Sequence, residues 1–64
     1  MYYKSFEIKT AKKEDRWQAQ IRKMDGGLTT CRGVSRDVFV TPDAPTEDYA
    51  ISLARSYIDA GEIR

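Results

Sequence analysis

The side chains best suited to hold a ligand in this chain are basic, and most of them lie in its first half. Residues 1–36 contain nine Lys or Arg and four Asp or Glu (9 − 4 = +5), whereas residues 37–64 contain two and six (2 − 6 = −4). Basic groups that neutralise phosphates release counterions, so a cluster of them can bind nucleic acid without reading its sequence. The candidate face for nucleic acid or another partner comprises Lys9, Lys12, Lys13, Arg16, Arg22, Arg32, Arg36 and Tyr3, whose ring could stack on a base.

The same residues have a second interpretation. Small soluble domains are commonly this rich in charge, and the chain as a whole carries a net charge of only +1. The basic residues would then form a solvated sheet face that complements the acidic half, with Tyr3 covering a neighbouring strand.

The chain lacks the residue sets used in catalysis. It has no histidine, so the Ser/His and Cys/His pairs that activate a nucleophile cannot form. Cys31 stands beside Arg32, which favours the thiolate, but no base accompanies it. Glu14 and Asp15 fall in an expected exposed turn, and a domain of this size can hardly enclose a cleft that would tune two carboxylates. We expect that the protein is not an enzyme.

Cofactor and metal sites are not expected either. The pair Gly26-Gly27 fits neither the dinucleotide-binding nor the Walker spacing and is typical of a turn. A zinc site needs several Cys or His ligands at set spacings, whereas the chain has one Cys and no His. The sequence therefore predicts no cofactor and no metal.

Chain length limits how the domain can be stabilised. Sixty-four residues suit a single domain spanning 1–64, and a domain of this size hides only about 60% of its unfolded surface. One Cys cannot form an internal disulfide, so good packing or self-association must supply stability. No segment approaches the roughly 20 apolar residues of a membrane span, and the first residues have no signal-peptide core. We expect a cytoplasmic protein without a membrane partner.

Two alternating runs predict a β-hairpin that carries most of the basic residues. In the first run, from Tyr2 to Ala11, Phe6 and Ile8 point to one face, together with Tyr2, while Tyr3 points to the other. In the second run, from Trp17 to Arg22, alternate residues are again apolar. The five charged residues 12–16 predict the turn between the runs, and Asp25-Gly26-Gly27 ends the second run.

The second half predicts one more strand and a helix. Val38 to Val40 form a short strand, with both valines on the core face and Phe39 opposite. A further strand near Leu28 to Arg32, or a bulge at Gly33, is left open. Two prolines then break the chain, Thr46 caps the helix and Gly61 ends it. Its apolar side contains Ala50, Ile51, Leu53, Ala54, Tyr57 and Ile58.

These elements predict an α+β fold with two layers: an antiparallel sheet of three or four strands, in the order β-β-β-α, and one C-terminal helix packed on one face. An exposed Phe39 or Tyr2 at a sheet edge is the candidate for self-association. We expect a non-enzymatic interaction module, with protein binding or self-association ahead of nucleic-acid binding. The expected core is Phe6, Ile8, Trp17, Ala19, Ile21, Val38, Val40, Ala50, Leu53, Ala54, Tyr57 and Ile58.

Two stretches resemble the small bacterial HicB-like domains: Glu14-Asp-Arg-Trp-Gln-Ala-Gln-Ile21 and Thr46-Glu-Asp-Tyr-Ala-Ile-Ser-Leu-Ala-Arg-Ser-Tyr-Ile58. In those domains a hairpin precedes a helix that begins with Thr and acidic residues and carries alanines one turn apart. The resemblance covers both ends of the chain and not the middle. It implies a bacterial protein that binds a small toxin ribonuclease through its sheet or helix face, with no catalytic residues. A different bacterial domain of β-β-β-α shape is the alternative.

Overall fold

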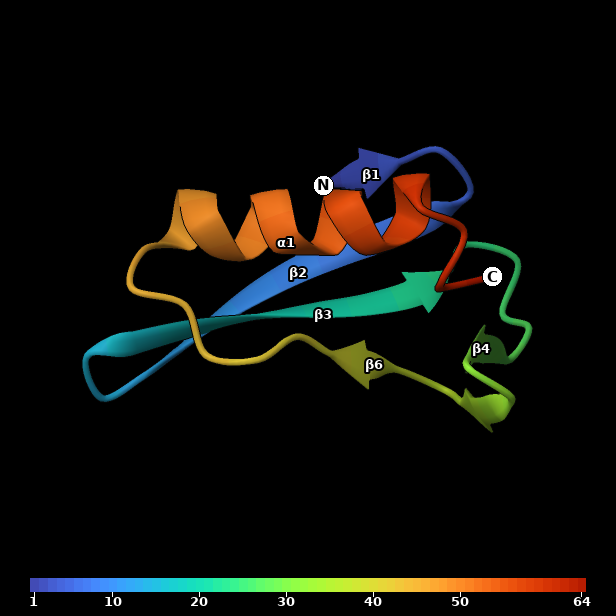
Figure 1. Cartoon of the computed structure of the whole chain (residues 1–64), viewed down its shortest axis with the longest axis horizontal. Coiled ribbons are helices and arrows are strands. Elements are labelled where there is room, and N and C mark those ends of the chain that lie inside the picture. The colour runs from blue at the N-terminus through green and yellow to red at the C-terminus, as the bar shows by residue number, and fades with distance from the viewer.

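The computed structural model describes all residues, Met1–Arg64, and they form a sheet layer and a helix layer (Figure 1). The elements are β1 (Tyr2–Tyr3), β2 (Phe6–Lys13), β3 (Arg16–Lys23), β4 (Thr29–Cys31), β5 (Val34–Arg36), β6 (Phe39–Val40) and α1 (Glu47–Asp59). The main sheet is antiparallel, in the order β1-β2-β3-β6, and α1 packs on one of its faces against β2 and β3. A second, two-stranded sheet pairs β4 with β5. The α+β prediction of an antiparallel sheet with one C-terminal helix is therefore confirmed.

The hairpin of β2 and β3 is the longest part of the sheet, and its register explains the two alternating runs. Ile8 lies opposite Ile21, and Thr10 lies opposite Ala19, so the apolar residues of both strands share the face under α1. The turn is tighter than the five-residue turn predicted from the charges. Only Glu14 and Asp15 connect the strands, and Glu14 adopts a positive φ of 59°. The neighbouring basic residues Lys12, Lys13 and Arg16 belong to the strands.

The N-terminal run does not form one continuous strand as predicted. The chain reverses at Lys4-Ser5, where Lys4 has a φ of 53°, and β1 folds back on β2 with Tyr3 opposite Phe6. A reversal through two residues changes which alternate positions share a face. Tyr3 therefore lies on the helix side, and Tyr2 lies opposite Glu7 on the other side. The predicted faces of both tyrosines were wrong because alternation was counted straight through the turn.

The middle of the chain forms a small hairpin, so the open question near Leu28 is settled in favour of a strand. Thr29–Cys31 pairs with Val34–Arg36 across a turn at Arg32-Gly33, where φ is 51° and 82°. Gly33 thus serves a turn rather than a bulge. The hairpin is fastened to the rest of the domain by backbone hydrogen bonds that Thr30 and Arg64 exchange, both 2.8 Å.

The last strand of the main sheet has its faces inverted relative to the prediction. Phe39 lies opposite Ile21 and packs against the core, whereas Val38 lies in a surface hollow on the other face and the side chain of Val40 is 49% exposed. The register is set by Thr41, whose backbone donates to Ala19 O (2.9 Å) while its hydroxyl accepts from Ala19 N (3.0 Å). A shift of one residue exchanges every side chain between faces, and so short a strand has no alternation to decide it.

The helix begins and ends as predicted. Thr46 adopts an extended conformation and its hydroxyl accepts from Tyr49 N at 3.1 Å, while Gly61 has a φ of 75° just beyond the last turn. α1 is too short and too polar to cross a membrane.

The core unites both layers, and it includes Ala44 and Ile63, which no periodic pattern marks. Its members are Phe6, Ile8, Ala19, Ile21, Ala44, Ala50, Ala54, Ile58 and Ile63, with Trp17, Phe39, Leu53 and Tyr57 partly buried around them.

Candidate functional site

One face of the main sheet is covered by α1, and no second layer covers the opposite face. We call the side chains that β2 and β3 direct to this uncovered side the outer face. The register sets them in two rows of four, each residue of β2 opposite one of β3. The outer face consists of Glu7, Lys9, Ala11 and Lys13 from β2, opposite Arg22, Gln20, Gln18 and Arg16 from β3.

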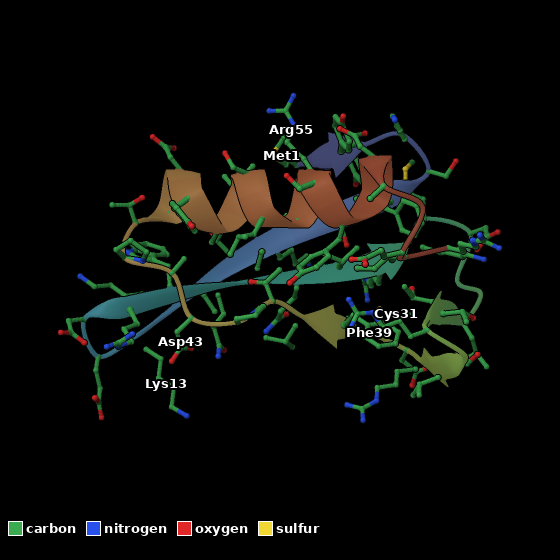
Figure 2. The ribbon with its side chains drawn as sticks, in the orientation of Figure 1. Met1, Lys13, Cys31, Phe39, Asp43 and Arg55 are labelled. Atoms are coloured by element: carbon green, nitrogen blue, oxygen red, sulfur yellow. The ribbon has the colours of Figure 1, made fainter.

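Four of the predicted basic residues converge on the outer face. Lys9, Lys13, Arg16 and Arg22 lie there, and Figure 2 shows Lys13 pointing away from α1. Lys13 is directly opposite Arg16 at the tip of the hairpin, and neither forms an ion pair at 4 Å or less. Like charges that face each other across strands destabilise a sheet. Both side chains are exposed to water, and the acidic turn Glu14-Asp15 lies between them, so their repulsion is screened; no ion pair at 4 Å or less occupies either cation.

The other predicted basic residues point elsewhere. Lys12 turns to the helix side, where its Nζ lies 5.8 Å from the centre of the Trp17 ring. Arg32 donates to Glu62 at 3.0 Å, in the turn between β4 and β5, and this hydrogen bond raises the pKa of the Arg32 guanidinium further. Arg36 lies over the ring of Phe39 at 5.9 Å. The predicted face of seven basic residues thus contains four.

Tyr3 is engaged with the helix and is not free to stack on a base. Its hydroxyl donates to both carboxylate oxygens of Asp59, at 2.7 and 2.9 Å, and Arg55 lies 4.7 Å above its ring. Lys4 donates to the same carboxylate at 2.6 Å. That hydrogen bond raises the pKa of Lys4, and together with the one from Tyr3 it lowers the pKa of Asp59. This cluster ties β1 to the last turn of α1.

One acidic side chain interrupts the outer face. Glu7 Oε1 accepts from Arg22 Nε at 3.0 Å and lies 3.9 Å from Lys9 Nζ. Burial by itself would raise the pKa of Glu7, but the hydrogen bond from Arg22 and the charges of Lys9 and Arg22 more than offset it, so the pKa is lowered. Glu7 is therefore ionised at neutral pH, and the eight outer-face side chains carry a net charge of +3 (4 − 1).

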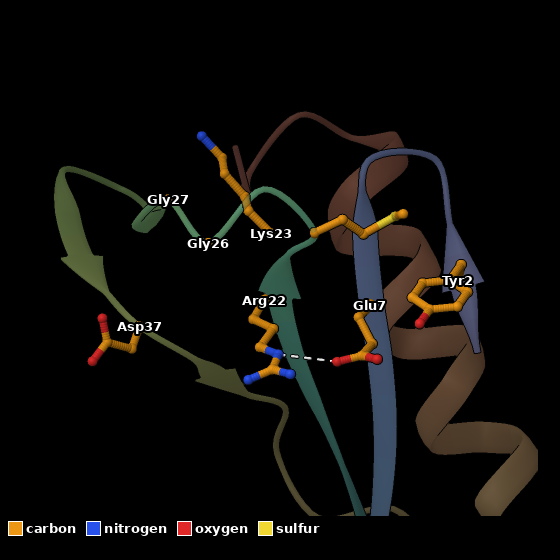
Figure 3. Close-up of a pocket in the computed structure, with 8 residues that line it drawn as sticks. Tyr2, Glu7, Arg22, Lys23, Gly26, Gly27 and Asp37 are labelled. Atoms are coloured by element: carbon orange, nitrogen blue, oxygen red, sulfur yellow. Dashed lines mark hydrogen bonds and ion pairs between the residues drawn. The ribbon is translucent and has the colours of Figure 1, made fainter.

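A polar hollow of about 550 Å³ continues the outer face at the open end of the hairpin, as Figure 3 shows. The paired Arg22 and Glu7 lie side by side in it, with Tyr2 next to Glu7. The hollow contains no nucleophile with an activating base, and no three His, Cys, Asp or Glu side chains of the domain converge to hold a metal ion. Its side chains suit hydrogen bonding, and its two cations, Arg22 and Lys23, are balanced by the carboxylates of Glu7 and Asp37. The remaining lining residues are Met24, Gly26 and Gly27.

The two residues expected to drive self-association, Phe39 and Tyr2, lie on opposite sides of the main sheet. Phe39 packs against the core and lines a small, mostly apolar hollow of about 180 Å³ together with Cys31, Tyr57 and Ile63. Tyr2 is 66% exposed and lies on the outer side of the sheet. Sequence reasoning missed this apolar hollow, because Ile63 lies beyond the helix and shows no periodic pattern.

Comparison with known proteins adds no relative. No family model matches the chain, and neither a curated protein nor a solved structure matches it significantly. The residues of the outer face therefore have to be interpreted from their geometry and chemistry.

Proposed function

We propose that this domain is a non-enzymatic binding module whose outer face holds the phosphates of a nucleic acid. The observation that carries the proposal is the unpaired Lys13 and Arg16, set opposite each other on a sheet face that nothing covers. Arg22 and Lys9 extend the positive charge along the same face, with Glu7 between them. Phosphate oxygens satisfy several such cations at once and release counterions.

We place nucleic-acid binding ahead of self-association, the reverse of the order expected from sequence. Self-association was expected through an exposed Phe39 or Tyr2; the Phe39 ring is turned to the core, whereas Tyr2 is 66% exposed on the outer side of the sheet. Nucleic-acid binding depended on converging basic residues, and four of the seven lie on the same face of the sheet. A neutral or apolar partner would leave Lys13 and Arg16 desolvated without a counter-charge, which is costly.

A matched pair of neighbouring lysines tests the proposal. Lys13→Gln removes a cation from the outer face, whereas Lys12→Gln removes the same charge from the helix side one residue away. Binding of a fluorescein-labelled 20-base-pair DNA is followed by anisotropy as salt is varied. Each lost phosphate contact lowers the slope of log K against log salt by about 0.9. We expect this loss for Lys13→Gln and a smaller one for Lys12→Gln. Absence of binding at 20 mM salt, or equal effects of the two variants, would contradict the proposal.

A second candidate function is self-association along β6. β6 is the last strand of the main sheet, and the hydrogen bonds of Thr41 to Ala19 imply that the backbone groups of Val40 point away from β3. An edge of this kind can pair with a strand of another copy. Sedimentation velocity at high protein concentration should then show a dimer that Val40→Lys abolishes. A monomer at every concentration would rule it out. Binding to a toxin ribonuclease, which the HicB-like resemblance implies, stays a prediction that pull-down with a candidate toxin can test.

A further inference from the structure

β6 is an edge strand of the main sheet, and part of its backbone has no partner. Thr41, just after β6, exchanges hydrogen bonds with Ala19 of β3. Residues of antiparallel strands alternate between those that bond to the neighbouring strand and those whose backbone groups point away from it. Val40 and Val38 therefore direct their N–H and C=O groups away from β3, and no hydrogen bond from elsewhere in the domain reaches them.

This edge lacks the features that keep exposed strands apart. Edge strands are usually protected by charged residues, prolines or bulges. The segment Val38-Phe39-Val40 contains none of these, and the first proline, Pro42, comes two residues later. Both valines lie on the outer side of the sheet, and Val40 is 49% exposed. Apolar side chains next to unpaired backbone groups suit the addition of another strand.

The same segment of a second copy fits this edge in one register. Two antiparallel copies can align their outward-pointing residues in three ways. With Val38 opposite Val38, Val40 would face Arg36, whose backbone is already paired in the second sheet. With Val40 opposite Val40, Val38 would face Pro42, which has no N–H to donate. With Val38 opposite Val40, a two-fold axis lies at Phe39, and each of these two valine pairs exchanges both of its backbone hydrogen bonds.

The side chains are complementary in this third register. On the outer side, Val38 of each copy lies opposite Val40 of the other, and β-branched cross-strand pairs stabilise antiparallel sheets. Asp37 falls opposite Thr41, so no charged residue of the segment faces its own copy. On the helix side, the two Phe39 side chains flank the axis, each beside its own apolar hollow of about 180 Å³. A second copy thus satisfies the edge without opposing like charges.

We infer that two copies of this chain pair antiparallel through β6, about a two-fold axis at Phe39, and form one continuous eight-stranded sheet. The inference rests on the self-association proposed above as the second function and specifies its register and symmetry. Antiparallel pairing within one sheet requires an axis perpendicular to the sheet. Both helices therefore lie on one side of the dimer. The two outer faces, each with a net charge of +3, lie together on the other side.

Disulfide formation between single-cysteine variants measures the register. Val38→Cys and Val40→Cys are made in a Cys31→Ser background, and circular dichroism checks that each variant folds. Opposite residues of a hydrogen-bonded pair have Cα atoms about 5.5 Å apart, which a disulfide can span. In a glutathione redox buffer, the mixture of both variants should form at least tenfold more covalent dimer than either variant alone. A dimer that cross-links equally well in one variant alone, or in none of the three samples, overturns the register. A monomer at every concentration in sedimentation velocity means that the proposed self-association itself fails.

A proline at the edge tests the backbone hydrogen bonds. Val40→Pro removes an N–H that points away from β3, and proline is tolerated at such edge positions, so the domain should still fold. The dimer then loses two hydrogen bonds, which should raise its Kd roughly 30-fold. The control Val40→Ala keeps the N–H and should raise the Kd less than tenfold. Sedimentation equilibrium measures both values, and equal effects of the two variants overturn the backbone pairing. Neither experiment involves DNA, so its outcome is independent of nucleic-acid binding.

Discussion

Phe39 and Val40 are neighbours in β6, and truncating each of them measures which face of the sheet holds the core. Full truncation of a buried Phe costs about 3–5 kcal/mol. Phe39 is partly buried against the core, so we expect Phe39→Ala to cost roughly 2–3 kcal/mol. Val40→Ala removes two methyl groups, worth about 0.8 kcal/mol each when buried. Because Val40 is 49% exposed, its truncation should cost about 0.8 kcal/mol or less.

Urea titration followed by circular dichroism separates the two variants. A 64-residue domain has a free energy of unfolding of about 3–10 kcal/mol at the usual value per residue. Phe39→Ala should therefore remove a large fraction of it and lower the Tm by roughly 10–20 °C, whereas Val40→Ala should lower it by a few degrees. The m-value should stay the same in both, since the exposed surface on unfolding hardly changes. If Val40→Ala destabilises as much as Phe39→Ala, the register that places Phe39 opposite Ile21 is wrong.

Three further outcomes are expected. Glu7→Gln removes the only negative charge of the outer face and frees Arg22, so the DNA duplex should bind about threefold more tightly at low salt; weaker binding would contradict the charge argument. Thr46→Ala removes the helix cap and should cost about 1 kcal/mol in urea titration, most of it restored by Thr46→Ser; a neutral Thr46→Ala would mean that the cap is dispensable. The pKa of Asp59 lies below its ordinary value of 3.8, mainly because its carboxylate accepts a hydrogen bond from Lys4. The ionised carboxylate therefore contributes its full stabilisation above pH 3.8, and this stabilisation is lost as the pH falls through the lowered pKa. Asp59→Asn should thus reduce the fall in the free energy of unfolding at acidic pH. An unchanged fall would show that the carboxylate contributes nothing.

The sequence predicts the parts of this fold that repeat a period over many residues. The hairpin of β2 and β3 is long enough for its alternation to identify both faces, and the helix has a stripe of apolar residues between two marked ends. Where an element is two or three residues long, the period carries no information. For that reason β1 and β6 were both assigned to the wrong face, and each correction depends on a turn or a hydrogen bond that only the folded chain reveals.

The candidate site could be predicted to the same extent. Lys9 and Arg22 belong to the long strands, and alternation puts them on the outer side. Lys12 and Lys13 were expected in a turn, where alternation does not apply, so their opposite directions could not be foreseen. Arg32 and Arg36 belong to a hairpin whose docking depends on Ile63 and Arg64, residues far away in sequence.

The separation of the two sets of alternating side chains on β2 and β3 makes the domain suitable as an engineering scaffold. The inner set, including Ile8, Ala19 and Ile21, forms the core with α1. Apart from the Glu7–Arg22 ion pair and the hydrogen bond of Gln18 to Asp43, the outer set is exposed to water, so it can be varied while the core sequence is kept. A library randomised at those eight positions would display new surfaces on one unchanged backbone, and binders to chosen targets could be selected from it without redesigning the fold.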